Sequence, residues 1–288
     1  MQDKGETQVR AWVEYFRDLG VHDFYRRGEP VPQPVRDADE GPATVNAAVE
    51  SGGYFSGDTT STPPIAETNF MPPPVRLISF NDLAPMPSAA IPAAEREAAL
   101  LAIQEEIGDC TRCPLAYAGR RKIVFGDGAA SARLMFVGEG PGADEDVQGL
   151  PFVGKAGQLL NNMIGAMGLA RAEVYIANIV KCRPPGNRVP EPTEANTCSQ
   201  FLLRQIDVVR PEAIVALGAT AATYLLGVKQ SLGSLRGRWH SCRGAKLAVT
   251  YHPAFLLRDP RQKAEAWKDL QMVMRELGLT PPAAKTKT

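Results

Sequence analysis

The chain has 288 residues with 32 basic and 32 acidic side chains, so its formal net charge is zero. This length suffices for one hydrophobic core with an appendage, and no apolar run approaches the ~20 residues that span a bilayer. No apolar stretch follows a basic start, so we expect no secretory signal and no membrane association, and a soluble cytoplasmic protein.

The zero net charge conceals an asymmetry along the chain. Residues 1–109 carry 8 basic and 18 acidic side chains, a net of −10, whereas residues 110–288 carry 24 and 14, a net of +10. The basic part suits a protein that meets a polyanion, although a solvated surface with a biased charge count explains it equally well. The cysteine count is five, which in a reducing cytosol favours metal binding or catalysis over a disulfide framework.

The first predicted element is a short amphipathic helix within residues 1–27. Its apolar side chains at i, i+3, i+4 and i+7 are Trp12, Tyr15, Phe16 and Leu19. Residues 28–92 hold 12 of the 24 prolines and show no sustained apolar period, which predicts a disordered linker. The helix is expected either to pack on the main domain or to dock a partner protein.

The compact domain is predicted at residues 93–280, with a disordered tail at 281–288. It opens with a helix at 93–107, rich in Ala, Glu and Leu. Four apolar runs then predict strands, at 133–138, 174–179, 213–218 and 246–251. Helical patterns occur at 155–167, 193–209, 220–226 and 261–277. This alternation predicts an α/β fold with a central four-stranded parallel sheet and helices on both faces.

Residues with chemical potential follow the predicted strands at their carboxyl ends, where such sheets bind ligands. The run GEGPG (138–142) follows the first strand, Asn178 ends the second, and His252 follows the fourth. The glycine loop is not a phosphate-binding sequence, because GK[ST] is missing and the spacing departs from GxGxxG. The acidic run 144–146 indicates either acid–base chemistry or an ordinary turn with solvated carboxylates. His252 is either structural or catalytic, and Phe152 is either a core residue or a flat surface on which a base stacks.

The cysteines form a second constellation. Cys110 and Cys113 make a CxxC pair, Cys182 and Cys198 are separated by fifteen residues, and Cys242 stands alone. Four thiolates can hold zinc or an iron–sulfur cubane, and wide spacing favours the cluster without deciding between them. The alternative is that Cys182 and Cys198 are ordinary buried thiols.

Six motifs between residues 100 and 277 occur in the order found in one known family: CTRCPL, GEGPGADED, PFVGKAG, ANIVKCRPPGNRVP, LGATAA and TYHPAFLLR. On these motifs the chain closely resembles the family 4 uracil-DNA glycosylases, which carry a 4Fe–4S cluster. The resemblance implies a three-layer α/β/α fold. It also implies a monofunctional enzyme of base excision repair that hydrolyses the N-glycosidic bond of uracil flipped out of DNA and leaves an abasic site. The cluster ligands that it implies are Cys110, Cys113, Cys182 and Cys198, with Cys242 free.

The resemblance also assigns roles in the pocket. It implies that Phe152 is the stacking platform for uracil, that Asn178 reads the O4 and N3 edge, and that His252 donates to O2. Glu139, Gly140 and Glu145 are implied on the water side, and a carboxylate there is expected to position the water. Family 1 enzymes have an Asp where this chain has Gly140, so the identity of that carboxylate is open.

The end of the last motif is expected to contact DNA. An apolar wedge can fill the gap that a flipped base leaves, and an Arg can meet phosphate. The residues concerned are Phe255, Leu256, Leu257 and Arg258. The alternative is that Leu256 and Leu257 belong to the buried face of the final helix.

Two rival functions stay open: a cluster-bearing DNA-damage binding protein or electron carrier, and a sister glycosylase with another base specificity. We expect a monomer associated with the nucleoid that acts on uracil in single- or double-stranded DNA. Through residues 1–27 we expect it to dock another protein of replication or repair.

Overall fold

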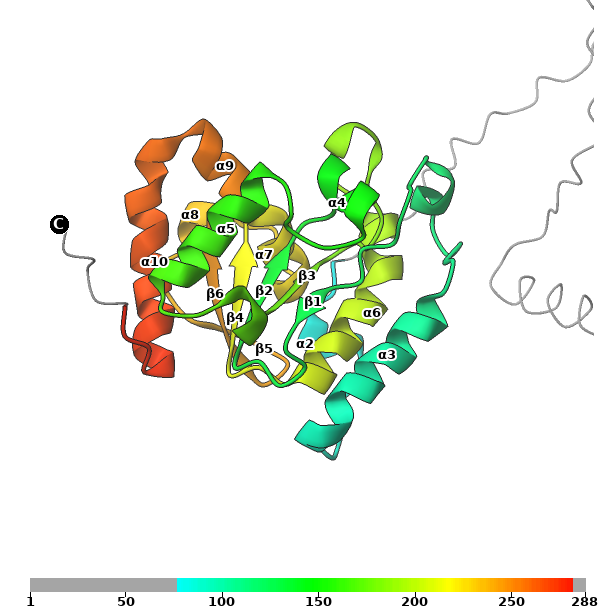
Figure 1. The fold of residues 1–288 in the computed structure, drawn as a ribbon, viewed down its shortest axis with the longest axis horizontal. Coiled ribbons are helices and arrows are strands. Elements are labelled where there is room, and N and C mark those ends of the chain that lie inside the picture. Colours follow the sequence, from blue (N-terminus) through cyan, green and yellow to red (C-terminus); the bar gives the residue numbers. More distant parts are fainter. Residues whose placement is uncertain (1–76, 282–288) are drawn as a thin grey trace, which may run out of the picture. The chain divides into compact units, whose positions relative to one another are not determined.

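The computed structural model describes residues 77–281 (Figure 1). The predictions for the helix within 1–27, for most of the linker at 28–92 and for the tail at 281–288 therefore lie outside the described residues. Within the described part, no helix is long and apolar enough to cross a membrane.

A six-stranded sheet in the order β1-β3-β2-β4-β6-β5 forms the centre of the domain. Its four inner strands are parallel, as predicted: β3 (Tyr175–Asn178), β2 (Leu134–Gly138), β4 (Ala213–Leu217) and β6 (Ala245–Thr250). The sheet is larger than the predicted four strands, because β1 (Asp127–Gly128) and β5 (His240–Cys242) add antiparallel edges. These edge strands are too short to carry a period in the sequence.

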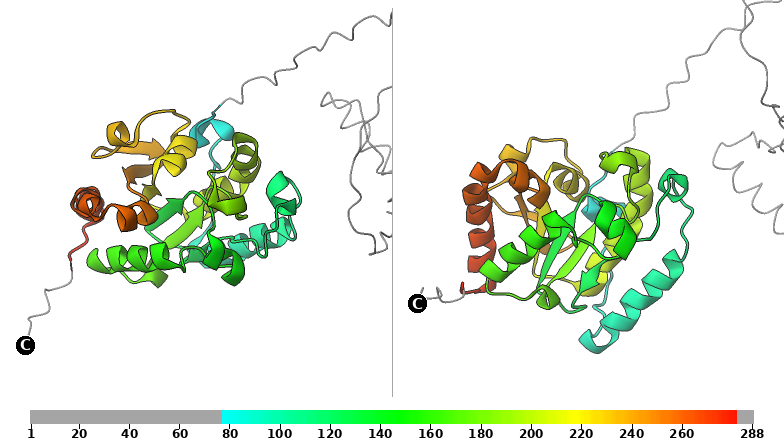
Figure 2. Two further views of the ribbon diagram at one scale, coloured as in Figure 1. Left: turned by 90° about the horizontal axis from the view of Figure 1, so that it is seen from above. Right: turned by 45° about the horizontal axis from the view of Figure 1, so that its top comes forward.

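Alternate residues of the inner strands enter two separate cores, because successive side chains of a strand point to opposite faces. On β2, Met135 and Val137 pack with α3, α6 and α7, whereas Leu134 and Phe136 pack with α5 and α10. The three-layer α/β/α fold is thereby confirmed (Figure 2). The α-helices are α2 (Phe80–Leu83), α3 (Arg96–Ile107), α4 (Ala143–Gln148), α5 (Lys155–Ala166), α6 (Pro192–Val209), α7 (Ala219–Leu226), α8 (Leu232–Leu235), α9 (Pro253–Arg258) and α10 (Lys263–Leu277).

Short 3-10 turns connect several of these elements. They are η1 (Ala93–Glu95), η2 (Pro114–Tyr117), η3 (Arg171–Glu173), η4 (Pro185–Asn187) and η5 (Pro260–Gln262). The five helices predicted within 93–280 correspond to η1 with α3, and to α5, α6, α7 and α10. The helices α4 and α9, which carry residues of the site, were not predicted as helices, because six residues are too few to show a helical period.

The packed part of the chain begins before residue 92, which corrects the predicted linker boundary. Phe80 on α2 is 1% exposed and belongs to the larger core. Arg243 holds this segment by donating to the carbonyl oxygens of Phe80, Ala84 and Pro85, and it pairs with Asp207 at 2.6 Å. A single buried Phe among prolines gives no periodic signal, so composition alone placed residues 77–92 in the linker.

Candidate active site

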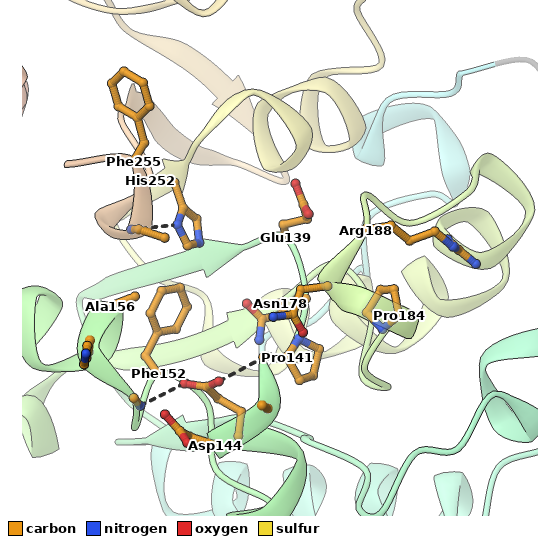
Figure 3. A pocket seen from close by; sticks show the side chains of 18 of the residues that line it. Glu139, Pro141, Asp144, Phe152, Ala156, Asn178, Pro184, Arg188, His252 and Phe255 are labelled. Atoms are coloured by element: carbon orange, nitrogen blue, oxygen red, sulfur yellow. Dashed lines mark hydrogen bonds between the residues drawn. The ribbon is translucent and has the colours of Figure 1, made fainter. Parts of the chain in front are cut away.

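A cavity of about 570 Å³ opens at the carboxyl edge of the parallel strands (Figure 3). It is bounded by the loop after β2, the end of β3, the segment around η4, and the start of α9. The predicted site residues that line it are Glu139, Gly140, Glu145, Phe152, Asn178, His252, Phe255 and Arg258. The structure thus brings together in one cavity residues that are more than 100 positions apart in the sequence.

Asn178 stands at the end of β3 and is 1% exposed. Its Oδ1 is buried and has no hydrogen-bond partner among the described residues. A buried acceptor without a partner costs about 1–3 kcal/mol, so a ligand that supplies an N–H there recovers a contact the protein itself does not make. Gly138 makes this arrangement possible, since a Cβ at that position would lie 2.4 Å from Asn178 Oδ1 and 2.6 Å from Phe152 Cζ.

His252 caps α9 in a way that fixes its tautomer. Its Nδ1 accepts a hydrogen bond from the Ala254 N–H at 3.1 Å, so the proton of the neutral ring is on Nε2. Burial, with a smaller contribution from the Arg258 charge, lowers the pKa of His252 to about 4, and Glu145 opposes the shift. The imidazole is therefore a neutral N–H donor at the pocket (Figure 3).

Phe152 forms one wall of the pocket. Its ring centroid lies 5.6 Å from that of His252, and the two planes are tilted by 33°. The ring is 5% exposed and also belongs to the core packed against α5, so the predicted core role holds, and the predicted stacking of a base on the ring stays a prediction. Its φ of 51° is in the left-handed region, which costs a non-glycine residue on the order of 1–3 kcal/mol.

Glu145 braces the loops of the pocket. Its carboxylate accepts hydrogen bonds from the backbone N–H groups of Gly142 at 3.0 Å, Val153 at 2.9 Å and Gly154 at 3.0 Å. These contacts give Glu145 a positioning role that the motif did not indicate, and its predicted catalytic role stays a prediction. The other predicted carboxylate, Glu139, is half-buried and lines the same cavity.

Gly140 lies where a side chain would collide with the wall of the site. A Cβ there would lie 2.7 Å from Val180 Cγ2. An Asp at this position, as in the family 1 enzymes, would therefore require Val180 to shift. Gly140 itself offers no carboxylate, and the predicted role of a pocket carboxylate in positioning water stays a prediction.

The predicted DNA-contacting segment divides into exposed and buried residues on α9. Leu256 is 1% exposed, so the prediction that it contacts DNA is wrong, and the alternative of a buried residue holds for it. Leu257 is 43% exposed and available as a wedge. Phe255 and Arg258 line the pocket, and Phe255 stacks on Tyr251 with 5.1 Å between ring centroids.

Arg188 is a pocket residue that the sequence motif contained but to which no role was assigned. It makes a bidentate pair with Glu194 at 2.8 and 2.7 Å, and the Glu194 side chain is 2% exposed. The hydrogen bond from Arg188 lowers the pKa of Glu194. The pair fastens the segment around η4 to the start of α6, on the side of the pocket opposite His252 and Phe255 (Figure 3).

The four predicted ligand cysteines line a second cavity, together with Ile107, Ile123, Phe201 and other residues. Three of the sulfurs accept hydrogen bonds, at 3.4 Å from Arg112 to Cys110, 3.4 Å from Arg120 to Cys182 and 3.3 Å from the Lys181 N–H to Cys198. Burial raises the pKa of Cys198 to about 12, although Lys181 opposes the shift. Cys242 is 0% exposed and does not line this cavity.

The second cavity differs from a site for one ion. Within residues 77–281, no three His, Cys, Asp or Glu side chains are grouped to hold a single metal ion. All four cysteines line one apolar cavity, and the N–H donors around it suit anionic sulfur. The four cysteines are therefore the candidate ligands of a metal group.

Lys181 connects the two cavities, a role that no sequence signal indicated. Its side chain is 1% exposed, and its ammonium donates to the Asn178 carbonyl at 3.1 Å and to Gln205 Oε1 at 2.5 Å. Burial lowers the pKa of Lys181 to about 8, and Cys198 opposes the shift. One residue thus contacts a cysteine through its backbone and the pocket asparagine through its side chain.

Comparison with known proteins gives a consistent set of relatives. The profile of the Uracil DNA glycosylase superfamily matches residues 125–271. The chain is 46% identical over 166 residues to the type-4 uracil-DNA glycosylase of Thermotoga maritima, an alignment that covers 57% of this chain and 86% of that protein. The type-4 enzymes of Pyrobaculum aerophilum and Saccharolobus solfataricus are 42% and 41% identical, over 59% and 62% of this chain and 90% and 87% of theirs.

Proposed function

Because the chain belongs to the type-4 uracil-DNA glycosylases, we propose that its pocket binds uracil flipped out of DNA and hydrolyses the N-glycosidic bond, leaving an abasic site. The observation that carries the assignment of the pocket is the buried, unpartnered Oδ1 of Asn178. Uracil offers an N–H at N3 beside the carbonyl oxygen O4, which matches the acceptor and donor of an asparagine amide. Cytosine presents the reverse pattern and would leave buried polar groups unpaired, which supports strong discrimination.

Phe152 is the proposed platform for the base. Extracting a nucleotide from a duplex costs a few kcal/mol, and stacking on an aromatic ring returns ~1–3 kcal/mol. The ring lies beside both Asn178 and His252, so a base stacked on it has its edge near both polar side chains.

His252 is the proposed catalytic donor. When the bond between C1′ and N1 breaks, its electron pair leaves with the uracil, and negative charge develops at O2. The neutral Nε2–H of His252 donates a hydrogen bond to that oxygen, which typically contributes ~2.7–4 kcal/mol to a developing oxyanion. The oxygen of water then bonds to C1′, and the proton that the water loses passes to the uracil anion, so the products are neutral uracil and the abasic sugar.

The carboxylates are proposed to act on the sugar side. Glu139 lines the pocket, and an anionic group there both stabilises the cationic sugar and orients the water. Glu145, whose oxygens hold three backbone N–H groups, contributes mainly by fixing the loop geometry. On this division, Glu139 is the residue that positions the water.

We propose that Cys110, Cys113, Cys182 and Cys198 hold a 4Fe–4S cluster. The fit of four sulfurs around one cavity supports the cluster, as does the type-4 relationship. When bound, the group would cross-link the segment after α3 to the loop after β3 and to α6, and it would supply no chemistry to glycosidic cleavage. The hydrogen-bond donors Arg112, Arg120 and Lys181 would balance its negative charge.

Exposed side chains around the mouth are proposed to hold the DNA. Leu257 would fill the gap left by the flipped base, and Arg258 would contact phosphate. We also propose that the protein acts as a monomer in the cytoplasm, on the nucleoid.

The decisive test is a panel of labelled oligonucleotides carrying single-stranded U, U·G, U·A, T·G or hypoxanthine. We expect uracil release from the U substrates and none from the others. Release of hypoxanthine at a comparable rate would favour the sister specificity. Binding without any base release would favour a non-enzymatic, cluster-bearing DNA-binding protein.

We further propose that residues 1–27 dock a protein of replication or repair, on the basis of their apolar stripe. The ~49 residues from 28 to 76, if taken as a flexible tether, would have a root-mean-square span of ~35–42 Å, which would let the catalytic domain act while residues 1–27 are docked. Deletion of residues 1–76 leaves α2 and Phe80 in place, whereas deletion of 1–90 removes a buried part of the domain. The shorter deletion should keep melting temperature and activity on naked DNA. A marked loss of either would show that residues 1–76 support the domain and would contradict docking.

A further inference from the structure

The backbone of residues 151–154 is held from two sides. On one side, Arg171 donates from Nη1 to the Phe152 carbonyl at 3.1 Å and from Nη2 to the Pro151 carbonyl at 2.6 Å. On the other side, Glu145 accepts from the N–H groups of Val153 and Gly154. A cationic fork and a carboxylate thus hold consecutive peptide groups on either side of the pocket ring.

This segment needs such support because its backbone is strained. Phe152 has a φ of 51°, a conformation that a residue with a bulky side chain adopts only where its surroundings impose it. Helix α5 also approaches this backbone closely, since a Cβ at Gly157 would lie 1.9 Å from the Phe152 carbonyl oxygen. The orientation of the ring therefore depends on contacts made by its main chain.

Asp127 fixes the guanidinium that makes these contacts. Its Oδ2 accepts from Arg171 Nε at 3.2 Å and Nη2 at 3.1 Å, and Asn161 Oδ1 accepts from Nη1 at 3.0 Å. Asp127 lies on β1, which pairs with β3, the strand that carries Asn178. Through Arg171 and Asp127, the backbone of Phe152 is therefore connected to β1, the edge strand next to β3.

We propose that Arg171, held by Asp127, is a positioning residue that sets the angle of the Phe152 platform for the flipped base. Neither residue lines the pocket, so both act through Phe152. The inference rests on the proposed role of Phe152 as the platform. A lysine cannot replace the arginine, because one ammonium cannot span two carbonyls and a carboxylate as a planar fork does.

The test compares Arg171→Lys with Arg133→Lys. Arg133 is a matched control, because it also pairs with a carboxylate, Glu212, and a carbonyl, that of Leu277, but it precedes β2 at the opposite end of the sheet. We expect Arg171→Lys to lower the single-turnover rate of uracil release about tenfold and to weaken inhibition by free uracil. Arg133→Lys should stay within twofold of the wild type in both.

Two further measurements separate positioning from general destabilisation. Amide hydrogen exchange of the segment 151–154 should rise in Arg171→Lys and not in Arg133→Lys. In the Phe152→Ala background, Arg171→Lys should cause no additional loss of rate, because the platform is already gone.

Equal losses of the uracil-release rate in Arg171→Lys and Arg133→Lys would overturn the inference. So would a double variant, Phe152→Ala with Arg171→Lys, whose loss of rate is the product of the two single losses. Wild-type uracil release by Phe152→Ala would overturn the platform itself. Asp127→Asn is the milder companion variant if Arg171→Lys fails to fold. It should raise exchange at 151–154 while leaving the arginine in place, and unchanged exchange would contradict the proposal.

Discussion

The proposed uracil pocket and the cysteine cavity meet at the segment that follows β3, where Lys181 contacts both, but they differ in how the protein holds their polar groups. In the pocket, the protein's own backbone fixes His252 and Glu145 through hydrogen bonds, and one buried acceptor on Asn178 stays open. In the cysteine cavity, burial raises the pKa of Cys182, although Arg120 opposes the shift, and it raises that of Cys198 to about 12. Buried thiols with raised pKa values favour the protonated form, which is a poor ligand.

The difference indicates two kinds of construction. The pocket is preorganised for a substrate that comes and goes, which is where fixed hydrogen-bond donors are most effective. In the cysteine cavity, the proposed cluster would supply the positive iron centres that stabilise thiolate. A variant that alters one cavity should therefore be measured for both iron content and uracil release.

The largest effect is expected on the cofactor. Cys182→Ser should abolish stoichiometric iron and the broad brown absorption, because cluster ligation needs all four thiolates. Cys242→Ser alters a thiol that is also buried but lies outside the cavity, and it should keep the iron. Iron and sulfide analysis with the visible spectrum checks both variants, and stoichiometric zinc in the wild type would end the cluster assignment.

The next effect is confined to the pocket. His252→Ala should lower single-turnover uracil release by about 10²–10³-fold, the usual cost of removing one preorganised donor. Iron content and binding to abasic DNA should persist, because neither depends on the imidazole. His240→Ala, a change on β5 that removes a hydrogen bond to the Leu235 carbonyl, serves as the control. Near-normal release by His252→Ala would contradict the donor role.

Lys181→Met probes the connection between the cavities. Loss of the ammonium leaves the Asn178 carbonyl and Gln205 Oε1 without this donor, at a cost of about 1–3 kcal/mol for a buried acceptor. We expect a lower melting temperature and a loss of rate of about tenfold. Iron should stay bound, because the contact to Cys198 comes from the backbone N–H. Loss of iron with an unchanged rate would reverse the assignment.

The smallest effect concerns pH. His252 has a pKa of about 4 in the folded protein against 6.5 ordinarily, so the imidazole stays neutral between pH 7 and 5. The single-turnover rate should show no step centred near pH 6.5. The pKa of His252 is lower in the folded protein than in the unfolded chain, so protonation of this residue favours unfolding. Its contribution to the free energy of unfolding is fully present above pH 6.5 and is lost as the pH falls toward 4. A rate step at pH 6.5 that disappears in His252→Ala would contradict the buried, neutral ring.

The inner sheet was predictable from the sequence, because buried parallel strands read as apolar runs of five or six residues. The pocket residues were found through motifs at the strand ends, where such folds place their ligands. Arg171 and Asp127 gave no signal, because the contacts of Arg171 with the platform are to backbone atoms 19 and 20 residues away, and the two side chains meet across 44 residues. Leu256 and Leu257 could not be told apart either, since only the local turn of α9 decides which of them is buried.

The central claim is that the open acceptor of Asn178 is filled by the N3–H of uracil. The most direct test is the single-turnover rate on a single-stranded oligonucleotide whose uracil carries a methyl group at N3. The wild type should release this base at least ~10⁴-fold more slowly than uracil, because sites built to hydrogen-bond a substrate N–H reject analogues that lack it. In Asn178→Ala that difference should largely disappear. Release of N3-methyluracil by the wild type at a rate near that of uracil would contradict the account.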